Sequence, residues 1–255
     1  MVVSEEKIIL AADKKAEKNS LLQIREEDVA DLKYVERPKG GYSYIKRAGD
    51  LVIAFVALLV LLVPMLIISA AIYIDDPGKV LFRQNRIGLG GKTFELYKFR
   101  TMKESTPKYL STAEVDDPKK YLTKLGKLLR KTSLDELPQL INVLRGDMSM
   151  VGPRPLIPSE TDIHKMRTRF GVYNVRPGMT GLAQINGRDT VTPAAKVRWD
   201  VKYVENFGIK MDMKIFFSTV PNVLTRRGVV EGCKSTRTGN PEQAASETAA
   251  SAQKR

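Results

Sequence analysis

Two adjacent carboxylates, Asp135 and Glu136, are the side chains best suited to chemistry in this sequence. They stand in the segment 131–155, and the cationic side chains beside them are Arg130, Lys131, Arg145 and Arg154. A carboxylate pair ringed by cations suits chemistry on phosphate, because guanidinium and ammonium groups bind phosphate oxygens. A simpler alternative is that acids in the first turn of a helix only complement the helix dipole. The spacing alone leaves both interpretations open.

A helix must position this acidic pair. Four apolar residues recur at the helical spacing i, i+3, i+4 and i+7, namely Leu137, Leu140, Ile141 and Leu144. Ser133-x-x-Glu136 has the form of a capping box, in which the two side chains satisfy free N–H groups at the helix start. We therefore predict a helix that begins at the acidic pair and has one apolar face.

Two further regions have amphipathic character. The stretch 119–131 has leucines on one side and lysines on the other, as in a helix that lies on an anionic membrane surface. A helix of the domain with its basic side in water is the alternative. The region 196–225 is rich in Trp, Tyr, Phe, Ile and Met, which suit either a membrane interface or a core.

Two strand-like segments, 80–87 and 93–102, flank a glycine-rich turn at 88–91, so we predict a β-hairpin. The cations on this hairpin are Arg83, Arg86, Lys98 and Arg100. These groups either face water or, in the case of Lys98 and Arg100, approach the acidic pair.

Arg154 lies between Pro153 and Pro155, and a residue before a proline is held in an extended conformation. A preorganised guanidinium is a good bidentate clamp for phosphate. The segment 176–188 is a second glycine-containing stretch, whose backbone can approach a nucleotide closely. Neither segment matches a Walker loop or a Rossmann fingerprint, and each is also explained as a structural loop.

An apolar run from Leu51 to Ile74 contains 24 residues and no charge. A helix needs about 20 apolar residues to cross a bilayer, so this run is long enough. Pro64 stands near its middle, where a proline removes a hydrogen bond and kinks a helix. Positive charges flank the run on both sides, at Lys46, Arg47, Lys79, Arg83 and Arg86. Such flanks favour a broken helix that enters and leaves at the cytoplasmic face, and a kinked single span is the alternative.

The composition narrows the classes of partner and of catalyst. A formal net charge of +13 favours anionic partners such as phospholipid headgroups, nucleotides and pyrophosphates. No nucleic-acid-binding module is found in the sequence, so we expect no nucleic acid partner. One cysteine and one histidine argue against zinc sites and against Ser–His or Cys–His catalysis. A metal here would need oxygen ligands, which points to Mg²⁺.

The chain divides into four parts by composition. We predict a polar N-terminal extension at 1–41, a membrane helix with its flanks at 42–78, a catalytic domain at 79–228 and a disordered tail at 229–255. The predicted fold is mainly α-helical with a small β-hairpin and amphipathic helices at the membrane interface.

In its motifs and their order, the sequence resembles the monotopic phosphoglycosyl transferases, a family of bacterial sugar transferases. The resemblance covers roughly residues 42–228 and rests on the segments 46–50, 81–102, 124–156 and 176–188. Several long motifs in one order make this resemblance far more specific than a short pattern.

The resemblance implies a monotopic protein whose re-entrant helix, broken at Pro64, enters only the cytoplasmic leaflet of the bacterial cell membrane, among anionic lipids. It implies transfer of a sugar 1-phosphate from a UDP-sugar to polyprenyl (undecaprenyl) phosphate, with Mg²⁺ as cofactor. This transfer is the first membrane step of capsule, exopolysaccharide or other glycan assembly. A homo-oligomer is left open.

The resemblance also implies roles for the acidic pair. Asp135 is the nucleophile that attacks the β-phosphorus of the UDP-sugar, releases UMP and becomes an aspartyl phosphosugar. Glu136 binds Mg²⁺ together with Asp135 or positions the lipid phosphate.

Arg130 and Arg154 match family arginines that hold phosphate, and Lys98 and Arg100 are further candidates for phosphate binding. The competing hypothesis is a membrane-tethered protein that binds anionic ligands or nucleic acid without catalysis. That hypothesis predicts that Asp135→Asn leaves function intact and that binding weakens steeply with salt.

Overall fold

The computed structural model describes residues 24–106, 121–187 and 191–225. The predicted disordered tail at 229–255 lies outside these residues, as do residues 1–23 of the predicted N-terminal extension. The elements are, in chain order, η1 (Glu26–Val29), α2 (Tyr42–Asp75), β1 (Leu81–Ile87), η2 (Leu89–Gly91), β2 (Thr93–Phe99), α4 (Lys124–Thr132), η3 (Leu134–Glu136), α5 (Gln139–Arg145), β3 (Ser149–Val151), α6 (Thr161–Arg169), η4 (Val172–Asn174), β4 (Gly178–Thr180), α7 (Leu182–Ile185), α8 (Pro193–Glu205) and α9 (Ile209–Thr225).

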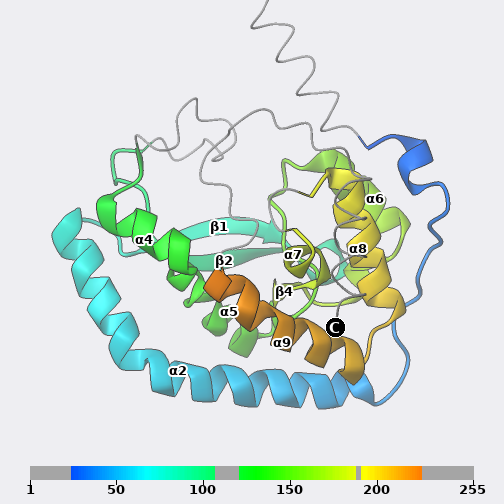
Figure 1. Ribbon diagram of the computed structural model, residues 1–255, viewed down its shortest axis with the longest axis horizontal. Coiled ribbons are helices and arrows are strands. Elements are labelled where there is room, and N and C mark those ends of the chain that lie inside the picture. Colours follow the sequence, from blue (N-terminus) through cyan, green and yellow to red (C-terminus); the bar gives the residue numbers. More distant parts are fainter. Residues whose placement is uncertain (1–23, 107–120, 188–190, 226–255) are drawn as a thin grey trace, which may run out of the picture.

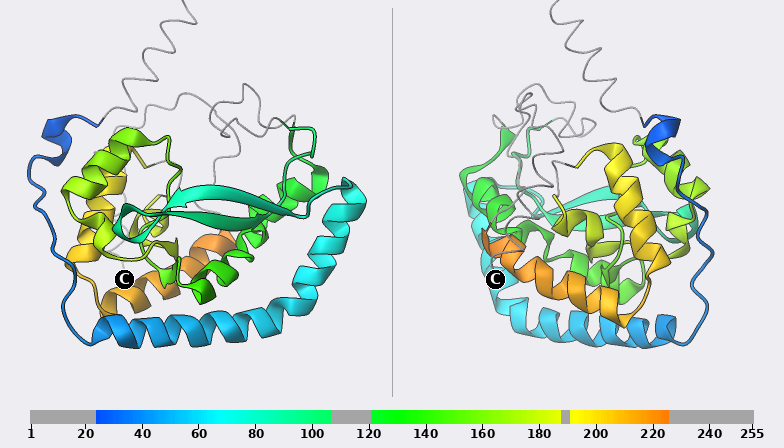
Figure 2. Two further views of the ribbon diagram at one scale, coloured as in Figure 1. Left: turned by 180° about the vertical axis from the view of Figure 1, so that it is seen from behind. Right: turned by 45° about the vertical axis from the view of Figure 1, so that its right-hand side comes forward.

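One long helix, α2, runs along an edge of the molecule and then bends, and a body of short helices and two small sheets rests on it (Figure 1). The view from behind shows the same two arms of α2 beside the hairpin of β1 and β2 (Figure 2). The strands of this hairpin are antiparallel, with Leu81 opposite Phe99 and Ile87 opposite Thr93. The prediction of a mainly helical protein with a small β-hairpin is therefore confirmed.

The outer surface of α2 is apolar and is not covered by the described residues. The helix has 34 residues, and almost none of its most apolar stretch is buried. Its large exposed side chains include Phe55, Val60, Val63 and Ile67. Burying one such side chain is worth about 1.5–3 kcal/mol, so a continuous surface of this kind favours an apolar solvent. By length and composition α2 is able to cross a membrane, which is compatible with a monotopic membrane protein.

Pro64 lies inside α2, and the helix continues through it. The sequence predicts a break at this proline, whereas the structure has a continuous helix with two arms (Figures 1 and 2). A bend without a break keeps the remaining backbone groups paired inside the helix. That pairing is what a lipid environment requires, because lipid offers backbone groups no hydrogen-bond partner.

Buried polar contacts fasten the first arm of α2 to the body. Asp50 is only 5% exposed, and its carboxylate accepts hydrogen bonds from the Ser149 hydroxyl at 2.7 Å and the Met150 N–H at 3.1 Å. One turn earlier, Lys46 donates to the Asp212 carboxylate of α9 at 2.6 Å. These contacts tie α2 to β3 and to α9 and so fix the orientation of the membrane helix relative to the body.

Apolar contacts on the inner side of α2 complete the attachment. The first arm packs through Ala54 into a cluster with Leu96, Leu140, Val143 and Met148. The second arm packs through Ile72 against Phe99 and Leu129. Because these partners come from β2, α4 and α5, both arms contact the elements that surround the acidic pair.

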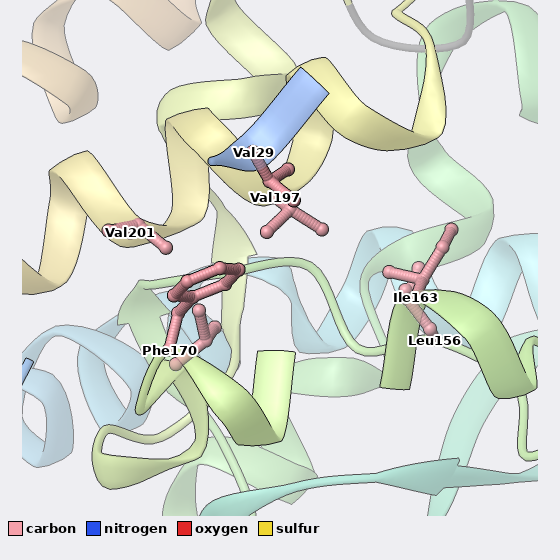
Figure 3. Packing of buried hydrophobic residues seen from close by; sticks show 7 residues of the cluster. Val29, Leu156, Ile163, Phe170, Val197 and Val201 are labelled. Carbon is pink, nitrogen blue, oxygen red and sulfur yellow. The ribbon is translucent and has the colours of Figure 1, made fainter. Parts of the chain in front are cut away.

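The N-terminal turn η1 packs into the body rather than lying loosely on its surface. Val29 is 1% exposed and contacts a cluster built mainly from α6 and α8, in which Figure 3 shows Phe170, Val197 and Val201. Arg198 of α8 donates to Asp31 at 2.6 Å. Residues 24–35 of the predicted extension therefore contribute to the core of the protein.

The short strands β3 and β4 form a parallel pair in segments that the sequence indicates only as loops. Their backbones approach so closely that a Cβ atom on Gly178 would lie 2.1 Å from the Gly152 nitrogen. Glycine is required where two backbones meet in this way. The glycines of the two loops thus join the Arg154 segment to β4.

Asp50→Ala should destabilise the fold, because it leaves the Met150 N–H without its acceptor and removes the nearer of the two acceptors of the buried Ser149 hydroxyl. The expected loss is about 1–3 kcal/mol of unfolding free energy, measured by thermal or denaturant unfolding in detergent. Asp75→Ala, at the exposed end of the same helix, is the matched control and should change stability little. Equal effects of the two substitutions would contradict the anchoring role of Asp50.

Candidate active site

The acidic pair lies in a single 3₁₀ turn, η3, between α4 and α5. The predicted capping box is wrong, because Ser133 makes no side-chain capping hydrogen bond and α5 begins only at Gln139. Pro138 explains this late start, since it has no N–H to donate to the carbonyl four residues earlier. The pair therefore stands on a tight turn before the helix and not within its first turn.

Glu136 is the more strongly paired of the two carboxylates. Its Oε1 accepts hydrogen bonds from Lys98 Nζ and from Arg154 Nη2, both at 2.9 Å. Burial opposes ionisation of Glu136, but the charges and hydrogen bonds of Arg154 and Lys98 outweigh it and hold the pKa well below its usual value. Glu136 is thus an ionised carboxylate fixed between two cations.

Asp135 is 8% exposed and lies in a different electrostatic setting. Burial, and after it the negative charge of Glu136, raises the pKa of Asp135 to about 6. The positive charges of Lys98, Arg130 and Arg154 act in the opposite direction and keep this rise limited. Near neutral pH, Asp135 is therefore an ionised carboxylate that is poorly solvated, which is a suitable state for a nucleophile.

Arg130 stands at the end of α4, close enough to Asp135 for each charge to favour the ionised form of the other. Its Nε donates to Thr101 Oγ1 at 2.9 Å, which fixes the plane of the guanidinium. Burial lowers the pKa of Arg130, because a desolvated cation is disfavoured. A guanidinium held in this way can bind an anion without first giving up much water.

The segment that carries Arg154 is held rigidly at its backbone. Each of its four successive carbonyl groups, from Pro153 to Leu156, accepts a hydrogen bond. The donors are, in order, the Gly178 N–H at 2.9 Å, the Arg167 guanidinium at 2.9 Å, the Arg86 guanidinium at 3.4 Å and the Ile87 N–H at 3.1 Å. These four hydrogen bonds hold the backbone around Arg154 in place, which gives the predicted preorganisation of its guanidinium a physical basis.

Behind that segment lies a buried ion pair. Arg167 and Asp200 are 2% and 1% exposed, and Arg167 Nη2 donates to Asp200 Oδ2 at 2.6 Å. Since a buried ion pair costs desolvation energy, it is weak evidence for stability. Here the pair orients the Arg167 guanidinium so that Nη1, its second terminal nitrogen, donates to the carbonyl of Arg154.

Residues 41–226 match the family described as bacterial sugar transferases. The chain belongs to this family. An exopolysaccharide production protein of Sinorhizobium fredii, ExoY, is 39% identical over 206 residues, which cover 75% of this chain and 90% of the relative. The resemblance predicted from the sequence motifs is therefore confirmed.

Two other relatives of this sugar transferase carry more specific names. The UDP-glucose:undecaprenyl-phosphate glucose-1-phosphate transferase of Caulobacter vibrioides is 40% identical over 198 residues, which cover 74% of this chain and 73% of the relative. The UDP-N-acetylgalactosamine-undecaprenyl-phosphate N-acetylgalactosaminephosphotransferase of Aeromonas hydrophila is 36% identical over 196 residues, which cover 75% of this chain and 46% of that protein. The relatives thus share an acceptor and differ in the sugar.

In this sugar transferase, three of the four predicted phosphate-binding residues lie around the acidic pair, namely Lys98, Arg130 and Arg154. Arg100 lies elsewhere, because its guanidinium is buried and pairs with Asp76 and Glu104. Those contacts fasten the turn after α2 to the end of β2. We therefore leave Arg100 out of the candidate site.

The sequence did not identify Arg86, Arg167 or Asp200 as parts of the site. Arg167 and Asp200 are far from the pair in sequence, and a buried ion pair has no local signal. Arg86 had a usable signal, because it shares one face of the predicted hairpin with Lys98 once the register is known.

The acidic pair fits a magnesium ion that is shared with a substrate. Among the residues that the structure describes, no group of three or more acidic, histidine or cysteine side chains converges. Asp135 and Glu136 therefore offer at most their own carboxylate oxygens. Magnesium is commonly held by one or two carboxylates together with substrate phosphates, so this donor set is sufficient.

Asp135→Asn should raise thermal stability above pH 6, even if it abolishes activity. The pKa of Asp135 is higher in the folded chain than the ordinary value of 3.8, so ionising this carboxyl disfavours folding. The gain should be full above about pH 6 and should shrink as the pH falls toward about 4. Melting temperatures across this range test it, with exposed Asp162→Asn on α6 as the control. A loss of stability at pH 8 would contradict the assigned environment.

Proposed function

We propose that this protein is a membrane-bound phosphoglycosyl transferase. It transfers a sugar 1-phosphate from a UDP-sugar to undecaprenyl phosphate at the cytoplasmic face of the bacterial cell membrane. The observation that carries this proposal is the pair Asp135 and Glu136, one poorly solvated and one firmly ion-paired, within a ring of three cations. The names of relatives 36–40% identical to this chain support the same donor and acceptor classes.

In the first step, an oxygen of the Asp135 carboxylate attacks the β-phosphorus of the donor. A new phosphorus–oxygen bond forms to Asp135, and the bond from the β-phosphorus to the bridging oxygen breaks. The bridging oxygen keeps the electron pair and leaves as part of UMP. The product is an aspartyl phosphosugar, so the carboxylate acts as a covalent catalyst and needs no proton transfer in this step.

In the second step, an oxygen of undecaprenyl phosphate attacks the same phosphorus. The bond between the phosphorus and Asp135 breaks, and the carboxylate is restored. The product is a lipid diphosphate that carries the sugar, as the first membrane-bound intermediate of an exopolysaccharide or another glycan. Two displacements at one phosphorus require that donor and acceptor use the same cationic site in turn.

Glu136, Lys98 and Arg154 form a fixed electrostatic frame for both steps. Because the Glu136 carboxylate already accepts hydrogen bonds from Lys98 and Arg154, it is held in place and does not act as the nucleophile in this proposal. In this proposal Lys98, Arg130 and Arg154, whose charges act on Asp135, stabilise negative charge on the transferring phosphoryl group. We further propose that Asp135 and Glu136 hold Mg²⁺, which when bound would neutralise charge on the diphosphate.

The bent helix α2 supports a re-entrant arrangement in the membrane. Its apolar outer surface is continuous, Pro64 lies within it, and cationic residues flank both ends. In this proposal both ends of α2 lie at the cytoplasmic face, and the anionic lipids of the inner leaflet contact the cationic flanks.

The reaction predicts UMP release from one or a few UDP-sugars in the presence of Mg²⁺ and undecaprenyl phosphate. Purified protein should be tested against UDP-glucose, UDP-galactose and their N-acetylated forms. Asp135→Asn should reduce the rate by at least about 10³-fold, because it removes the nucleophile. Asp162→Asn, a surface carboxylate outside the site, should retain the wild-type rate.

Retained activity in Asp135→Asn would show that the nucleophile is assigned wrongly. Absence of UMP release with every donor, together with salt-sensitive binding of nucleic acid or anionic lipid, would favour the competing hypothesis of a binding protein without catalysis. The donor that supports release identifies the sugar directly.

The re-entrant proposal predicts that reporter tags at the two chain ends are both cytoplasmic. Pro64→Leu removes the residue that disfavours a straight helix and should move part of the N-terminal tags to the outside. Val63→Leu is the matched control and should leave both tags cytoplasmic. A wild-type N-terminus outside the cytoplasm would overturn the re-entrant arrangement without affecting the assignment of Asp135.

A further inference from the structure

Arg86 is a partly buried cation that has no carboxylate partner among the residues that the structure describes. Its Nη2 donates to the Gln84 side-chain oxygen at 2.6 Å, and its Nη1 donates weakly to the Pro155 carbonyl at 3.4 Å. Its Nε is buried and has no hydrogen-bond partner among the described residues. No carboxylate of the described residues lies within ion-pair distance of Arg86, although this side chain is partly removed from water.

Arg83, three residues earlier on the same strand, has the ordinary environment of a surface arginine. Its side chain is 60% exposed, lies 3.5 Å from the Glu95 carboxylate and stands over the ring of Tyr97. The two arginines lie on opposite faces of β1, since side chains alternate along a strand. The unpaired state of Arg86 is thus a property of its face of the hairpin and not of the strand.

The face that carries Arg86 is the face of the acidic pair. In the hairpin register, Phe82 is opposite Lys98 and Arg86 is opposite Phe94, so Lys98 and Arg86 project from the same side. Lys98 reaches Glu136 from one end of this face. Arg86 reaches the backbone beside Arg154 from the other end.

Arg86 and Arg154 are like charges held near each other. Burial, and after it the positive charge of Arg154, lowers the pKa of Arg86 to about 10, while Glu160 and Glu136 act in the opposite direction. A guanidinium that is partly removed from water, has no carboxylate partner among the described residues and stands beside a second guanidinium favours the binding of an added anion. Phosphate oxygens are the ligands that such a pair of arginines binds best.

The contacts give the order of the groups along the site. Glu136, which follows Asp135 in the chain, accepts a hydrogen bond from Arg154 at 2.9 Å. Arg86 donates to the carbonyl of Pro155, the residue after Arg154. Arg86 thus lies beside Arg154, at the other end of the hairpin face from Lys98 and its contact with Glu136.

In a displacement at phosphorus, the attacking and leaving oxygens lie roughly in line on opposite sides. We propose that Arg86 binds the α-phosphate of the donor and stabilises the negative charge that the bridging oxygen gains as UMP leaves. This inference rests on the proposed function, because it takes Asp135 as the attacking group. It makes Arg86 a substrate-binding residue in addition to those found from the sequence.

The test is the affinity of the purified protein for UMP, UDP and uridine, measured by calorimetry. Arg86→Gln should weaken UMP and UDP binding by about 10- to 100-fold, the range for a lost charge-assisted hydrogen bond, and should leave uridine binding unchanged. Arg83→Gln is the matched control on the same strand and should bind all three ligands like the wild type. Arg86→Lys keeps the charge but lacks the guanidinium fork, so its affinity for UMP and UDP should lie between that of the wild type and that of Arg86→Gln.

Wild-type affinity of Arg86→Gln for UMP and UDP would overturn this inference and leave the proposed function intact. A wild-type protein that binds neither nucleotide would instead count against the proposed function. Arg154→Gln completes a double-mutant cycle. If Arg86→Gln has no further effect in the Arg154→Gln background, Arg86 acts only by holding the Pro155 carbonyl, and the direct contact with phosphate is refuted.

Discussion

The two hydrogen bonds of the Glu136 carboxylate hold the site together. Lys98 comes from β2, Arg154 comes from the loop after β3, and Glu136 stands in the turn between α4 and α5. One carboxylate thus joins three segments that are distant in sequence. The same contacts determine the chemistry of its neighbour, because Glu136 is strongly paired and stays ionised while Asp135 is buried beside that negative charge. Two adjacent acids therefore differ in reactivity through their surroundings alone.

A charged frame of this kind needs a rigid support, since an ion pair that can move gains little energy. The support is mostly backbone. The carbonyl groups around Arg154 are all engaged, and the glycine contacts of β3 and β4 hold that segment from the other side. The buried pair of Arg167 and Asp200 serves the same purpose, since it aligns one donor on the Arg154 carbonyl. Arg167 and Asp200, which are among the most deeply buried charged residues that the structure describes, thus lie behind the site, where their contribution is geometric.

Local patterns predicted the hairpin, the apolar helix and the acidic pair with cations nearby in the chain, because each has a signal within a few residues. The approach of Lys98 to the pair was one of two alternatives, because Lys98 lies 38 residues before Glu136. The capping pattern predicts a start of α5 that is too early, because Pro138 has no N–H and the helix begins only at Gln139. Arg100 is two residues after Lys98, a spacing at which the side chains of a strand share one face. However, β2 ends at Phe99, so Arg100 lies beyond the strand, and only the tertiary structure shows that it pairs with Asp76. The parallel pairing of β3 with β4 depends on contacts between distant segments, which no short window contains.

The apolar helix α2 and Asp135, the proposed nucleophile, are linked through α5. Arg47 of α2 donates to the carbonyls of Val143 and Leu144 at 2.7 and 3.2 Å, at the C-terminal end of α5, while Asp135 stands just before its N-terminal end. Seven helical residues rise by about 10 Å, so a short rigid rod separates the arm of α2 from the acidic pair. A lipid phosphate is confined to the headgroup layer, whereas a nucleotide sugar arrives from water. In the proposed function, Asp135 held at a fixed distance from α2 is the group that both substrates reach in turn, as the two-step transfer requires.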